Sequence, residues 1–320
     1  MDLYTFGEAM AVLVADPGVP LAQAQTFRRT VAGSEINVAC GLSRLGRSVA
    51  FASRVGADAF GDVVLRTLRS DGVDTSSVVV DPDAPTGLLV RDAHSERAVQ
   101  VAYYRAGSAA SRLHADDVVR REPARILYAT GITPLLSDGC AAATHAALAA
   151  ARATGSTVAY DPNLRRRLLD GREPAVLQEF SAYSDLILTG EDEGFAITGT
   201  TDVRAMADSF LDAGARLVLV KQGRSGAWAT DGKREWSHRP EPAHVLDPVG
   251  AGDAFNVGFL DVVLAAGDLG EVDVDEALAQ GSLCGRLAVQ VVGDIEGLPT
   301  RRELVALGTG LGARSGEVVR

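Results

Sequence analysis

The residues of this chain best suited to chemistry stand in one segment, DPVGAGDAF, residues 247–255. Gly250 and Gly252 flank Ala251, and glycines this close together let the backbone turn sharply and approach a ligand. The following AFNVGFLDVVLAA is typical of an apolar helix, so the turn opens on a helix N-terminus, where free amides and the helix dipole attract anions. Asp253 stands beside that anion site. Amides for a phosphoryl group and a carboxylate for an alcohol proton are the minimum groups for phosphoryl transfer to a hydroxyl.

Two local patterns leave a plainer interpretation open. A strand-to-helix turn whose aspartate only stabilises the dipole would have the same sequence as the 247–255 segment. A second segment, AGSEINVACGLSRLG at 32–46, places Gly33 and Asn37 at the start of a helix. There Asn37 could point into a cleft, but a capped surface helix fits the segment equally well.

Composition narrows the class of protein. The 320 residues are 47% hydrophobic, enough for a sizeable core, and the net charge of −11 argues against broad binding to nucleic acid or anionic membranes. Cys40, Cys140 and Cys284 are far apart and suggest buried free thiols without a zinc site. The chain shows neither a signal peptide at its start nor a membrane-spanning apolar run, so we expect a soluble cytoplasmic protein.

Short β-branched runs alternate with helical patterns and predict a mostly parallel sheet covered by helices on both faces. Expected strands are 48–54, 125–129, 157–160, 185–188 and 217–221, and expected helices are 34–45, 60–70, 140–154 and 203–213. Capping signals support them: Ser34 at a helix start, and Gly46, Gly72, Gly155 and Gly214 just past helix ends.

Two regions break this alternation. Residues 8–31 and 86–105 contain β-like runs without intervening helices, and 86–92 and 97–105, joined by AHSE, predict an antiparallel hairpin. These strands could form a small second sheet that acts as a lid over a cleft. A further hairpin is expected around Asp231-Gly232. We therefore expect one domain over 1–310 with a discontinuous lid from about 9–31 and 86–106, and a flexible tail at 311–320.

Together, the 32–46 and 247–255 segments resemble the two signatures of the ribokinase-like (PfkB) carbohydrate kinases, and the resemblance covers nearly the whole chain. It implies a doubly wound α/β sheet with a small β-sheet lid that often mediates dimerisation. It also implies that Gly250, Ala251 and Gly252 form the anion hole and that Asp253 is the catalytic base. ATP and Mg²⁺ would be required. Many members also need K⁺ near the anion hole, where Asp247 and Val249 occupy the matching turn.

Within this family the chain is most similar to the 2-keto-3-deoxygluconate kinases, through VAYYRAGSAAS at 101–111, YDPNLRRRLL at 160–169 and GDIEGLP at 293–299. The resemblance implies that Tyr103, Arg105 and Arg165 bind a sugar acid, together with Gly33, Asn37 and Asp253. Strand periodicity sends Tyr103 and Arg105 to one face and Tyr104 to the other, and arginine suits a carboxylate because it bonds in a bidentate fashion. Arg166 is expected at the surface.

Further matches concern the nucleotide side. TGEDEGFAITG at 189–199 resembles a motif that helps to organise magnesium, with Glu193 in the matching position and Gly190 where asparagine is common; a plain helix-start carboxylate is the alternative. Lys221 and Gly223 would lie near the ATP phosphates. Ser282 stands where relatives usually carry an adenine-side asparagine, and Leu89 where they usually carry an aromatic residue. The five histidines are assigned no role.

The expected activity is transfer of the ATP γ-phosphoryl group to a primary hydroxyl of 2-keto-3-deoxygluconate or a similar sugar acid, by a homodimer or higher homo-oligomer formed through the lid. A fructokinase or other neutral-sugar kinase is the first alternative, and a nucleoside kinase is a more distant one. A non-catalytic sugar- or nucleotide-binding regulator is an alternative of another class, disfavoured because Asp253 is retained. A dehydrogenase is disfavoured because no G-x-G-x-x-G follows the first strand.

Overall fold

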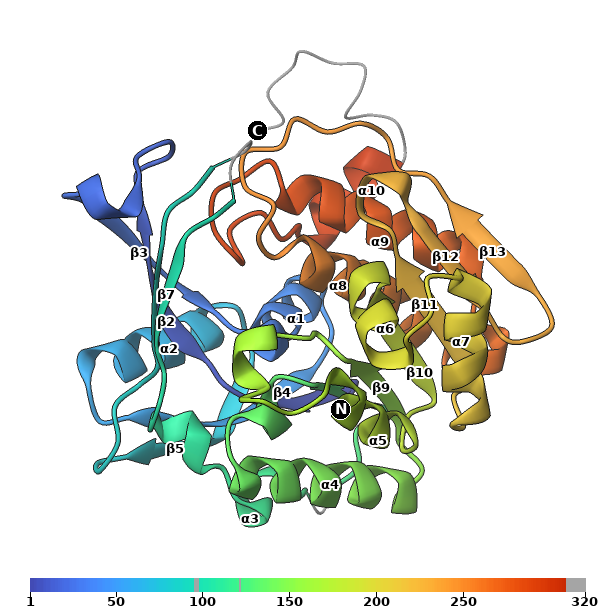
Figure 1. The fold of residues 1–320 in the computed structure, drawn as a ribbon, viewed down its shortest axis with the longest axis horizontal. Helices are drawn as coiled ribbons and strands as arrows, with labels where there is room; N and C mark the ends of the chain where they lie inside the picture. Colours follow the sequence, from blue (N-terminus) through green and yellow to red (C-terminus); the bar gives the residue numbers. More distant parts are fainter. Residues whose placement is uncertain (95–97, 121, 309–320) are drawn as a thin grey trace.

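The structure is a computed structural model that describes residues 1–94, 98–120 and 122–308. In these residues nine strands form one large sheet in the order β13-β12-β11-β10-β9-β8-β1-β4-β5 (Figure 1). From β11 to β5 neighbouring strands run parallel, and in the described residues only β12 runs the other way, antiparallel to both β11 and β13. The strands are β1 (Leu3–Phe6), β4 (Val49–Gly56), β5 (Asp74–Asp81), β8 (Ile126–Thr130), β9 (Thr157–Asp161), β10 (Leu186–Gly190), β11 (Leu217–Lys221), β12 (Ala227–Thr230) and β13 (Glu235–His238).

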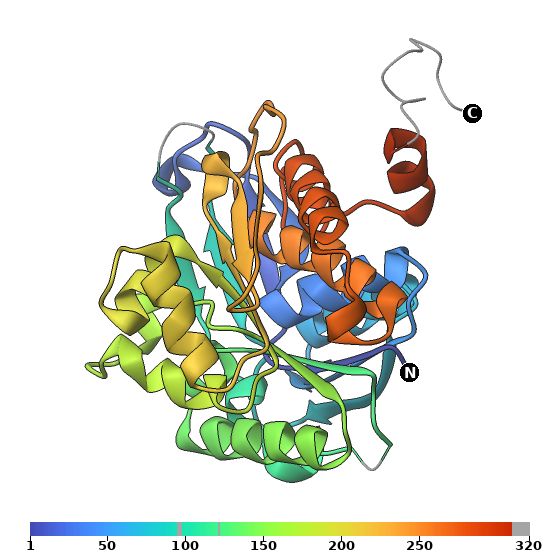
Figure 2. The same ribbon diagram turned by 90° about the vertical axis from the view of Figure 1, so that its right-hand side faces the viewer.

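Helices cover both faces of this sheet, as its alternating sequence predicted (Figure 2). One face packs against the helices α1, α2, α8 and α9, and the other against α3, α4, α5, α6 and α7. The helices are α1 (Ser34–Arg44), α2 (Ala59–Ser70), α3 (Ala115–Val118), α4 (Asp138–Ala153), α5 (Gln178–Ser181), α6 (Glu191–Thr198), α7 (Val203–Asp212), α8 (Ala251–Ala266), α9 (Val274–Ala288) and α10 (Arg301–Gly308). The expected doubly wound α/β sheet is confirmed.

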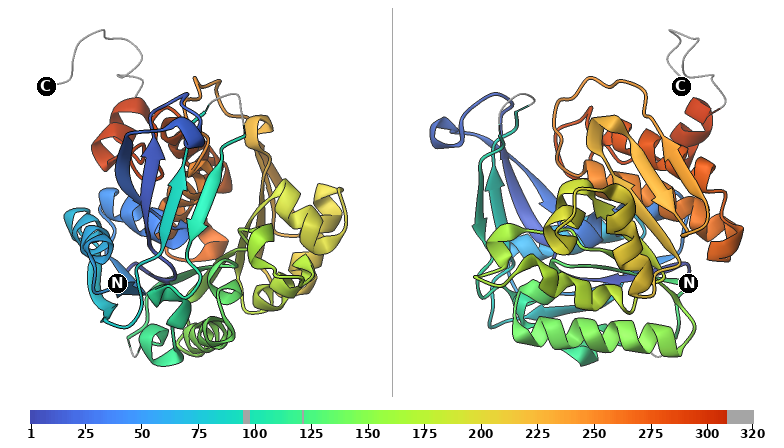
Figure 3. Two further views of the ribbon diagram at one scale, coloured as in Figure 1. Left: turned by 60° about the vertical axis from the view of Figure 1, so that its left-hand side comes forward. Right: turned by 45° about the vertical axis from the view of Figure 1, so that its right-hand side comes forward.

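A second sheet stands apart from the large one (Figure 3). Its strands β2 (Met10–Ala15), β3 (Phe27–Ala32), β6 (Leu88–Arg91) and β7 (Val101–Tyr104) lie in the order β3-β2-β6-β7, and β6 and β7 form the predicted antiparallel hairpin. We call this sheet the lid. Its inner face has a small apolar core of its own that includes Met10, Val12 and Leu89.

Two regions of the sequence prediction remain to be placed. The hairpin expected around Asp231-Gly232 is present as β12 and β13. Residues 95–97, which include part of the AHSE connection, and the tail 311–320 lie outside the described residues.

The three cysteines are free and buried, as expected. Within the described ranges no helix is both long and apolar enough to span a bilayer.

The strand order places a binding site at one edge of the large sheet. The chain runs from central β1 to β4 and β5 on one side, and then from β8 to β11 on the other. In open α/β sheets such a reversal leaves a crevice outside the carboxyl ends of the strands, where ligands bind. The lid faces this edge, and its strands β2 and β6 pair in parallel although 72 residues lie between the end of β2 and the start of β6.

Candidate active site

A cavity of about 460 Å³ lies between the inner face of the lid and the carboxyl ends of the parallel strands. Each central strand contributes a residue at or just beyond its carboxyl end: Glu8 after β1, Ile132 after β8, Asp161 of β9, Gly190 of β10 and Lys221 of β11. The lid contributes Met10, Leu89, Tyr103 and Arg105. The helix starts of α1 and α8 complete the wall with Gly33, Asn37 and the residues from Gly250 to Asp253.

Two helices bring Asn37 and Asp253 together. Asn37 lies one helical turn before Gly41 on α1, and Asp253 lies one turn before Val257 on α8. At Gly41 a Cβ atom would stand 2.4 Å from the Val257 side chain, so α1 and α8 pack closer there than any larger residue allows. Because residues four apart share one helix face, this close crossing places Asn37 directly opposite Asp253.

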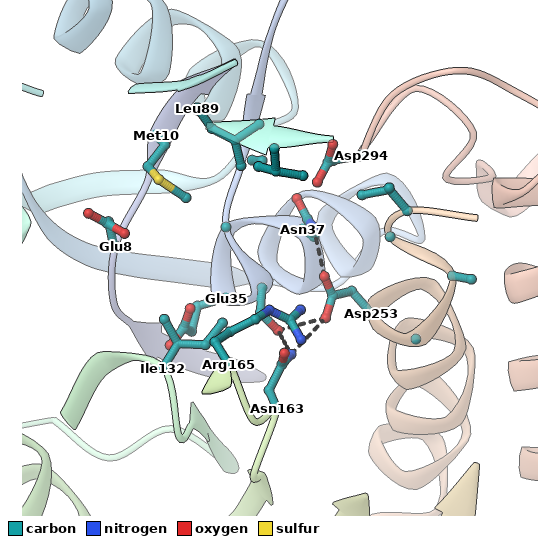
Figure 4. A pocket seen from close by; sticks show the side chains of 18 of the residues that line it. Glu8, Met10, Glu35, Asn37, Leu89, Ile132, Asn163, Arg165, Asp253 and Asp294 are labelled. Atoms are coloured by element: carbon teal, nitrogen blue, oxygen red, sulfur yellow. Dashed lines mark hydrogen bonds between the residues drawn. The ribbon is translucent and has the colours of Figure 1, made fainter. Parts of the chain in front are cut away.

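Asp253 is buried, with 8% exposure, and is held by neutral donors. The Ser34 hydroxyl donates to its Oδ1 at 2.6 Å, and the Asn37 amide donates to its Oδ2 at 2.7 Å. The Asn163 amide reaches Oδ1 at 3.4 Å, and Figure 4 shows Asn37 and Asn163 converging on this carboxylate. Burial raises the pKa of Asp253, and the bonds from Ser34 and Asn37 oppose that rise. The result is a fixed carboxylate of increased basicity that faces the cavity.

Ser34 corrects one detail of the sequence prediction. It was expected as a helix-capping residue, but Gly33 is the N-cap of α1 and makes no side-chain capping bond. The Ser34 hydroxyl is instead used by Asp253 and by the Asn163 amide at 2.7 Å. Gly33 has φ 149°, and a Cβ there would stand 2.3 Å from the Glu8 carbonyl oxygen, so the residue must be glycine.

The Gly-Ala-Gly turn begins α8, and all three of its residues line the cavity. Gly250 is the N-cap with φ 78°, in the left-handed region that favours glycine. Lys221 lies beside it, because a Cβ at Gly252 would stand 3.7 Å from the lysine Nζ. Free helix amides next to an ammonium group form an anion site.

Lys221 is held in place by a buried network. Its Nζ bonds to Asp161 Oδ2 at 2.7 Å and to Asn256 Oδ1 at 3.2 Å, and the Asn256 amide donates to Asp161 Oδ2 at 2.7 Å. Burial alone would lower the pKa of Lys221, but the Asp161 and Glu193 carboxylates outweigh it and the pKa is raised. Lys221 therefore carries its positive charge at neutral pH.

The lid places Tyr103 and Arg105 in the cavity and turns Tyr104 outward, as strand periodicity predicted. Tyr104 is 65% exposed, whereas the Arg105 guanidinium lies 5.4 Å from the centre of the Tyr103 ring. Arg105 also forms an ion pair with Glu8, a residue that the sequence analysis did not single out. Burial raises the pKa of Glu8, and Arg105 and Ser108 oppose that effect.

Arg165 and Glu193 lie on the opposite side of the cavity from the lid residues. Arg165 Nη1 is 3.9 Å from Glu193 Oε1, and the Arg165 side chain is 45% exposed. Glu193 Oε2 accepts a bond from the Gly190 amide at 3.0 Å, so the helix-start arrangement is present while the side chain still lines the cavity. Burial, and then the charge of Asp161, raise the pKa of Glu193. Arg166 is exposed, as expected.

Not every predicted residue reaches this cavity. Gly223 is exposed beyond the end of β11, and Ser282 is buried within α9; neither lines the cavity. Four residues buried around the site were not expected to belong to it: Glu8, Glu35, Ser34 and Asn163. Asn163 stood in the quoted YDPN segment and Ser34 beside Gly33, so sequence proximity could have indicated those two. Nothing in the sequence marked Glu8 or Glu35.

The fold and this cavity define a class: a ribokinase-like α/β protein with an anion-binding helix start, an adjacent buried carboxylate and a β-sheet lid. Residues 2–301 match the pfkB family of carbohydrate kinases, and the chain belongs to that family. A 2-dehydro-3-deoxygluconokinase of Bacillus subtilis (strain 168) is 37% identical over 312 residues, which cover 96% of this chain and 95% of that protein.

Solved structures agree with this assignment. An E. coli protein described as a ribokinase II, in complex with ATP and Mg²⁺, superposes with a TM-score of 0.87 at 25% identity, over 96% of this chain and 99% of that one. A Vibrio cholerae O395 fructokinase double mutant, bound to fructose, ADP and a potassium ion, gives 0.85 at 28% identity, over 96% and 98%.

Proposed function

We propose that this carbohydrate kinase transfers the γ-phosphoryl group of ATP to a primary hydroxyl of a sugar acid such as 2-keto-3-deoxygluconate. One observation carries the choice of substrate: Arg105 from the lid and Arg165 from the loop after β9 line the same cavity as Asp253. Two guanidinium groups around one cavity suit a carboxylate on the sugar. The similarity to the Bacillus subtilis 2-dehydro-3-deoxygluconokinase supports the same choice.

Asp253 is the proposed base. Ser34 and Asn37 fix both of its oxygens, so the side chain cannot rotate away from the cavity, and burial makes it more basic. The primary hydroxyl would donate its hydrogen bond to this carboxylate and lose its proton as its oxygen attacks phosphorus. A positioned base of this kind contributes about 10²- to 10⁴-fold to a reaction rate.

The Gly-Ala-Gly turn at residues 250–252, which we call the anion turn, is proposed to hold the transferred phosphoryl group. Gly250, Ala251 and Gly252 line the cavity at the start of α8, and the Lys221 ammonium lies beside Gly252. Donors fixed in this way stabilise the charge on the phosphoryl oxygens without rearrangement, each contributing about 3–4 kcal/mol. Gly223 and Ser282 stay predicted contacts of the nucleotide on the outer side of this turn.

Mg²⁺ fits the chemistry of this site. Magnesium keeps several waters and is usually held by one or two carboxylates together with substrate phosphates. Among the described residues no group of three or more His, Cys, Asp or Glu side chains could hold a metal, but the Glu193 carboxylate lines the cavity. Glu193 would thus orient the hydrated ion, whose chemical contribution is to neutralise the phosphates.

A neutral sugar is the second candidate, and one contact favours it. The ion pair with Glu8 offsets the charge of Arg105, so less positive charge is left for a carboxylate on the sugar. A fructokinase among the similar structures supports this alternative. Leu89 also stands at the lid position where an aromatic residue is usual in sugar-acid kinases.

A coupled ADP-release assay over a panel of sugars and sugar acids tests the proposal. We expect kcat/KM for 2-keto-3-deoxygluconate to exceed that for fructose by at least about tenfold, because a charged hydrogen bond contributes about 1.5–3 kcal/mol. A higher kcat/KM for fructose would indicate that the substrate is a neutral hexose and not a sugar acid. Absence of turnover with every compound would favour a non-catalytic regulator.

The lid is also the proposed surface for self-association. Its outer side exposes Tyr104 at 65% and Phe27 at 39%, and exposed aromatic residues are enriched at protein interfaces. Light scattering should give the mass of a dimer or a higher oligomer for the full chain. Tyr104→Asp together with Phe27→Asp should shift that mass to the monomer, and a monomeric unsubstituted chain would contradict the proposal.

A further inference from the structure

The lid carries one charged side chain that is completely buried. Arg91 is the last residue of β6 and is only 1% exposed. Arginine is almost never buried so fully without paired charges, and removing a guanidinium from water is costly unless carboxylates and hydrogen bonds compensate. The partners of Arg91 therefore indicate what this charge is for.

Those partners are two aspartates on either side of the anion turn. Arg91 Nη2 lies 2.7 Å from Asp247 Oδ2 and 3.2 Å from Asp294 Oδ1. Burial alone would lower the pKa of Arg91, but the two carboxylates outweigh it and raise the value. In the same cluster, burial raises the pKa of Asp294 to about 7. Arg91 is therefore a permanent cation that faces one or two negative charges.

Both aspartates set the geometry of the turn. Asp247 Oδ1 accepts a bond from the Val249 amide at 3.2 Å, and Oδ2 accepts one from the Gly293 amide at 3.1 Å. The Asp294 carbonyl oxygen packs against the turn so closely that a Cβ at Gly250 would stand 2.7 Å from it. Figure 4 shows Asp294 on the same wall as Asn37 and Asp253. Arg91 thus joins the two segments that support the anion site.

A potassium ion at the matching turn would need these same oxygens. The two Asp247 oxygens already accept three N–H donors, from Arg91, Val249 and Gly293. Donor groups that point at a carboxylate cannot share it with a cation in the same direction, and a guanidinium repels a second positive charge nearby. The residues around Asp247 therefore do not fit a potassium ion.

We propose that Arg91 is the built-in cation of the anion turn, a positioning residue that makes the kinase independent of potassium. Its charge holds the segments of Asp247 and Asp294 together and adds a positive field beside the amides of residues 250–252. Because Arg91 belongs to the lid, the same contact joins the lid to the phosphoryl site. A second lid strand reaches the neighbouring loop, where the Thr30 hydroxyl bonds to Glu296. The inference rests on the proposed role of the turn in holding the phosphoryl group.

The test compares potassium chloride with tetramethylammonium chloride at equal ionic strength. For the unsubstituted kinase we expect kcat and KM for ATP to agree within about twofold in the two salts. Arg91→Met should lower kcat by about 10- to 100-fold in tetramethylammonium chloride, less than the roughly 10²- to 10³-fold of a lost direct donor because Arg91 acts through the turn, and potassium should restore part of it. Arg91→Lys keeps the positive charge but lacks the planar guanidinium with its several donors. Its kcat should therefore fall less than that of Arg91→Met, and its activity should stay independent of potassium.

A second readout needs no substrate. The melting temperature of the unsubstituted protein should be equal in the two salts, whereas Arg91→Met should melt higher in potassium. Arg112→Met is the matched control: Arg112 pairs with Asp81, outside the cavity that contains the anion turn, and should show no potassium effect. A potassium-specific rise in melting temperature, or a tenfold gain in activity, for the unsubstituted protein would overturn the proposal even if Arg91→Met fails to fold. Full activity of Arg91→Met without potassium would also overturn it.

These outcomes are separable from failure of the proposed function. Lack of sugar-acid phosphorylation contradicts the substrate proposal and leaves the melting experiment intact. A potassium-specific effect on the protein without substrate contradicts the role of Arg91 and leaves the substrate proposal untouched.

Discussion

The surroundings of Asp253 and of Arg105 differ in how their charge is balanced. Asp253 of α8 receives hydrogen bonds from the neutral Ser34 and Asn37 side chains of α1, so these two contacts bring no opposite charge to it. Arg105 comes from the lid and faces the oppositely charged Glu8. The large domain thus keeps a reactive charge available, and the lid holds one that a ligand must share with the protein. We infer that the chemistry belongs to the rigid domain and the choice of substrate to the lid.

The sharpest way to break this comparison is Asp253→Asn. Loss of the base should reduce kcat by about 10²- to 10⁴-fold, while ATP and sugar still bind, because the amide keeps the size of the side chain. Turnover is measured by ADP release and binding by calorimetry. Asp192→Asn, at an exposed position outside the cavity, is the control. Near-normal turnover of Asp253→Asn would remove this residue as the base.

Arg105→Ala and Arg165→Ala test the assignment of specificity. Each should raise KM for the sugar acid by about 10- to 100-fold, the value of a charged hydrogen bond, and change kcat much less. Effects on fructose should be smaller. Steady-state kinetics with both compounds decide the matter, and the exposed Arg166→Ala serves as the control. Equal increases in KM for both sugars would indicate a neutral-sugar kinase.

Gly250→Ala tests how tightly the anion turn is fixed. Gly250 has a left-handed φ, and a Cβ there would stand 2.7 Å from the Asp294 carbonyl oxygen. The substitution should therefore reduce kcat by about tenfold and destabilise the protein by about 1–3 kcal/mol. Gly46→Ala is the matched control: its φ is 83°, but its Cβ would have open space, so only the backbone cost of about 1–2 kcal/mol applies. Activity and urea unfolding separate the two. Equal activity of the two variants would mean that the turn tolerates displacement.

The last prediction concerns stability, not turnover. Glu35 Oε1 accepts hydrogen bonds from the Thr130 hydroxyl at 2.7 Å and the Thr133 hydroxyl at 2.8 Å. Burial raises its pKa to about 7, above the ordinary value of 4.5. The protonated form is thus favoured in the folded state, and its stabilisation is complete below pH 4.5 and is lost as pH rises through 7. Between pH 5.5 and pH 8 the free energy of unfolding should fall by on the order of 2 kcal/mol more than in Glu35→Gln. Parallel pH profiles in urea would contradict this pKa.

The sequence predicted helices, strands and side-chain faces correctly where the pattern that indicates them lies within a few neighbouring residues. The alternation of strands and helices, the hairpin of β6 and β7, and the opposite faces of Tyr103 and Tyr104 follow from side-chain direction within a few residues. Capping was less predictable, because the Ser34 hydroxyl had a competing partner, Asp253, which is 219 positions away.

The sequence by itself determined which groups could do chemistry: a Gly-Ala-Gly turn before a helix and an aspartate one residue later are fixed by covalent spacing. Only the tertiary structure decided their partners. Glu8 meets Arg105, and Arg91 meets Asp247, across 97 and 156 residues that no local pattern spans. Such pairs form because folding removes charges from water and a buried charge requires an opposite one, and which one it meets depends on how sheet, helices and lid pack together.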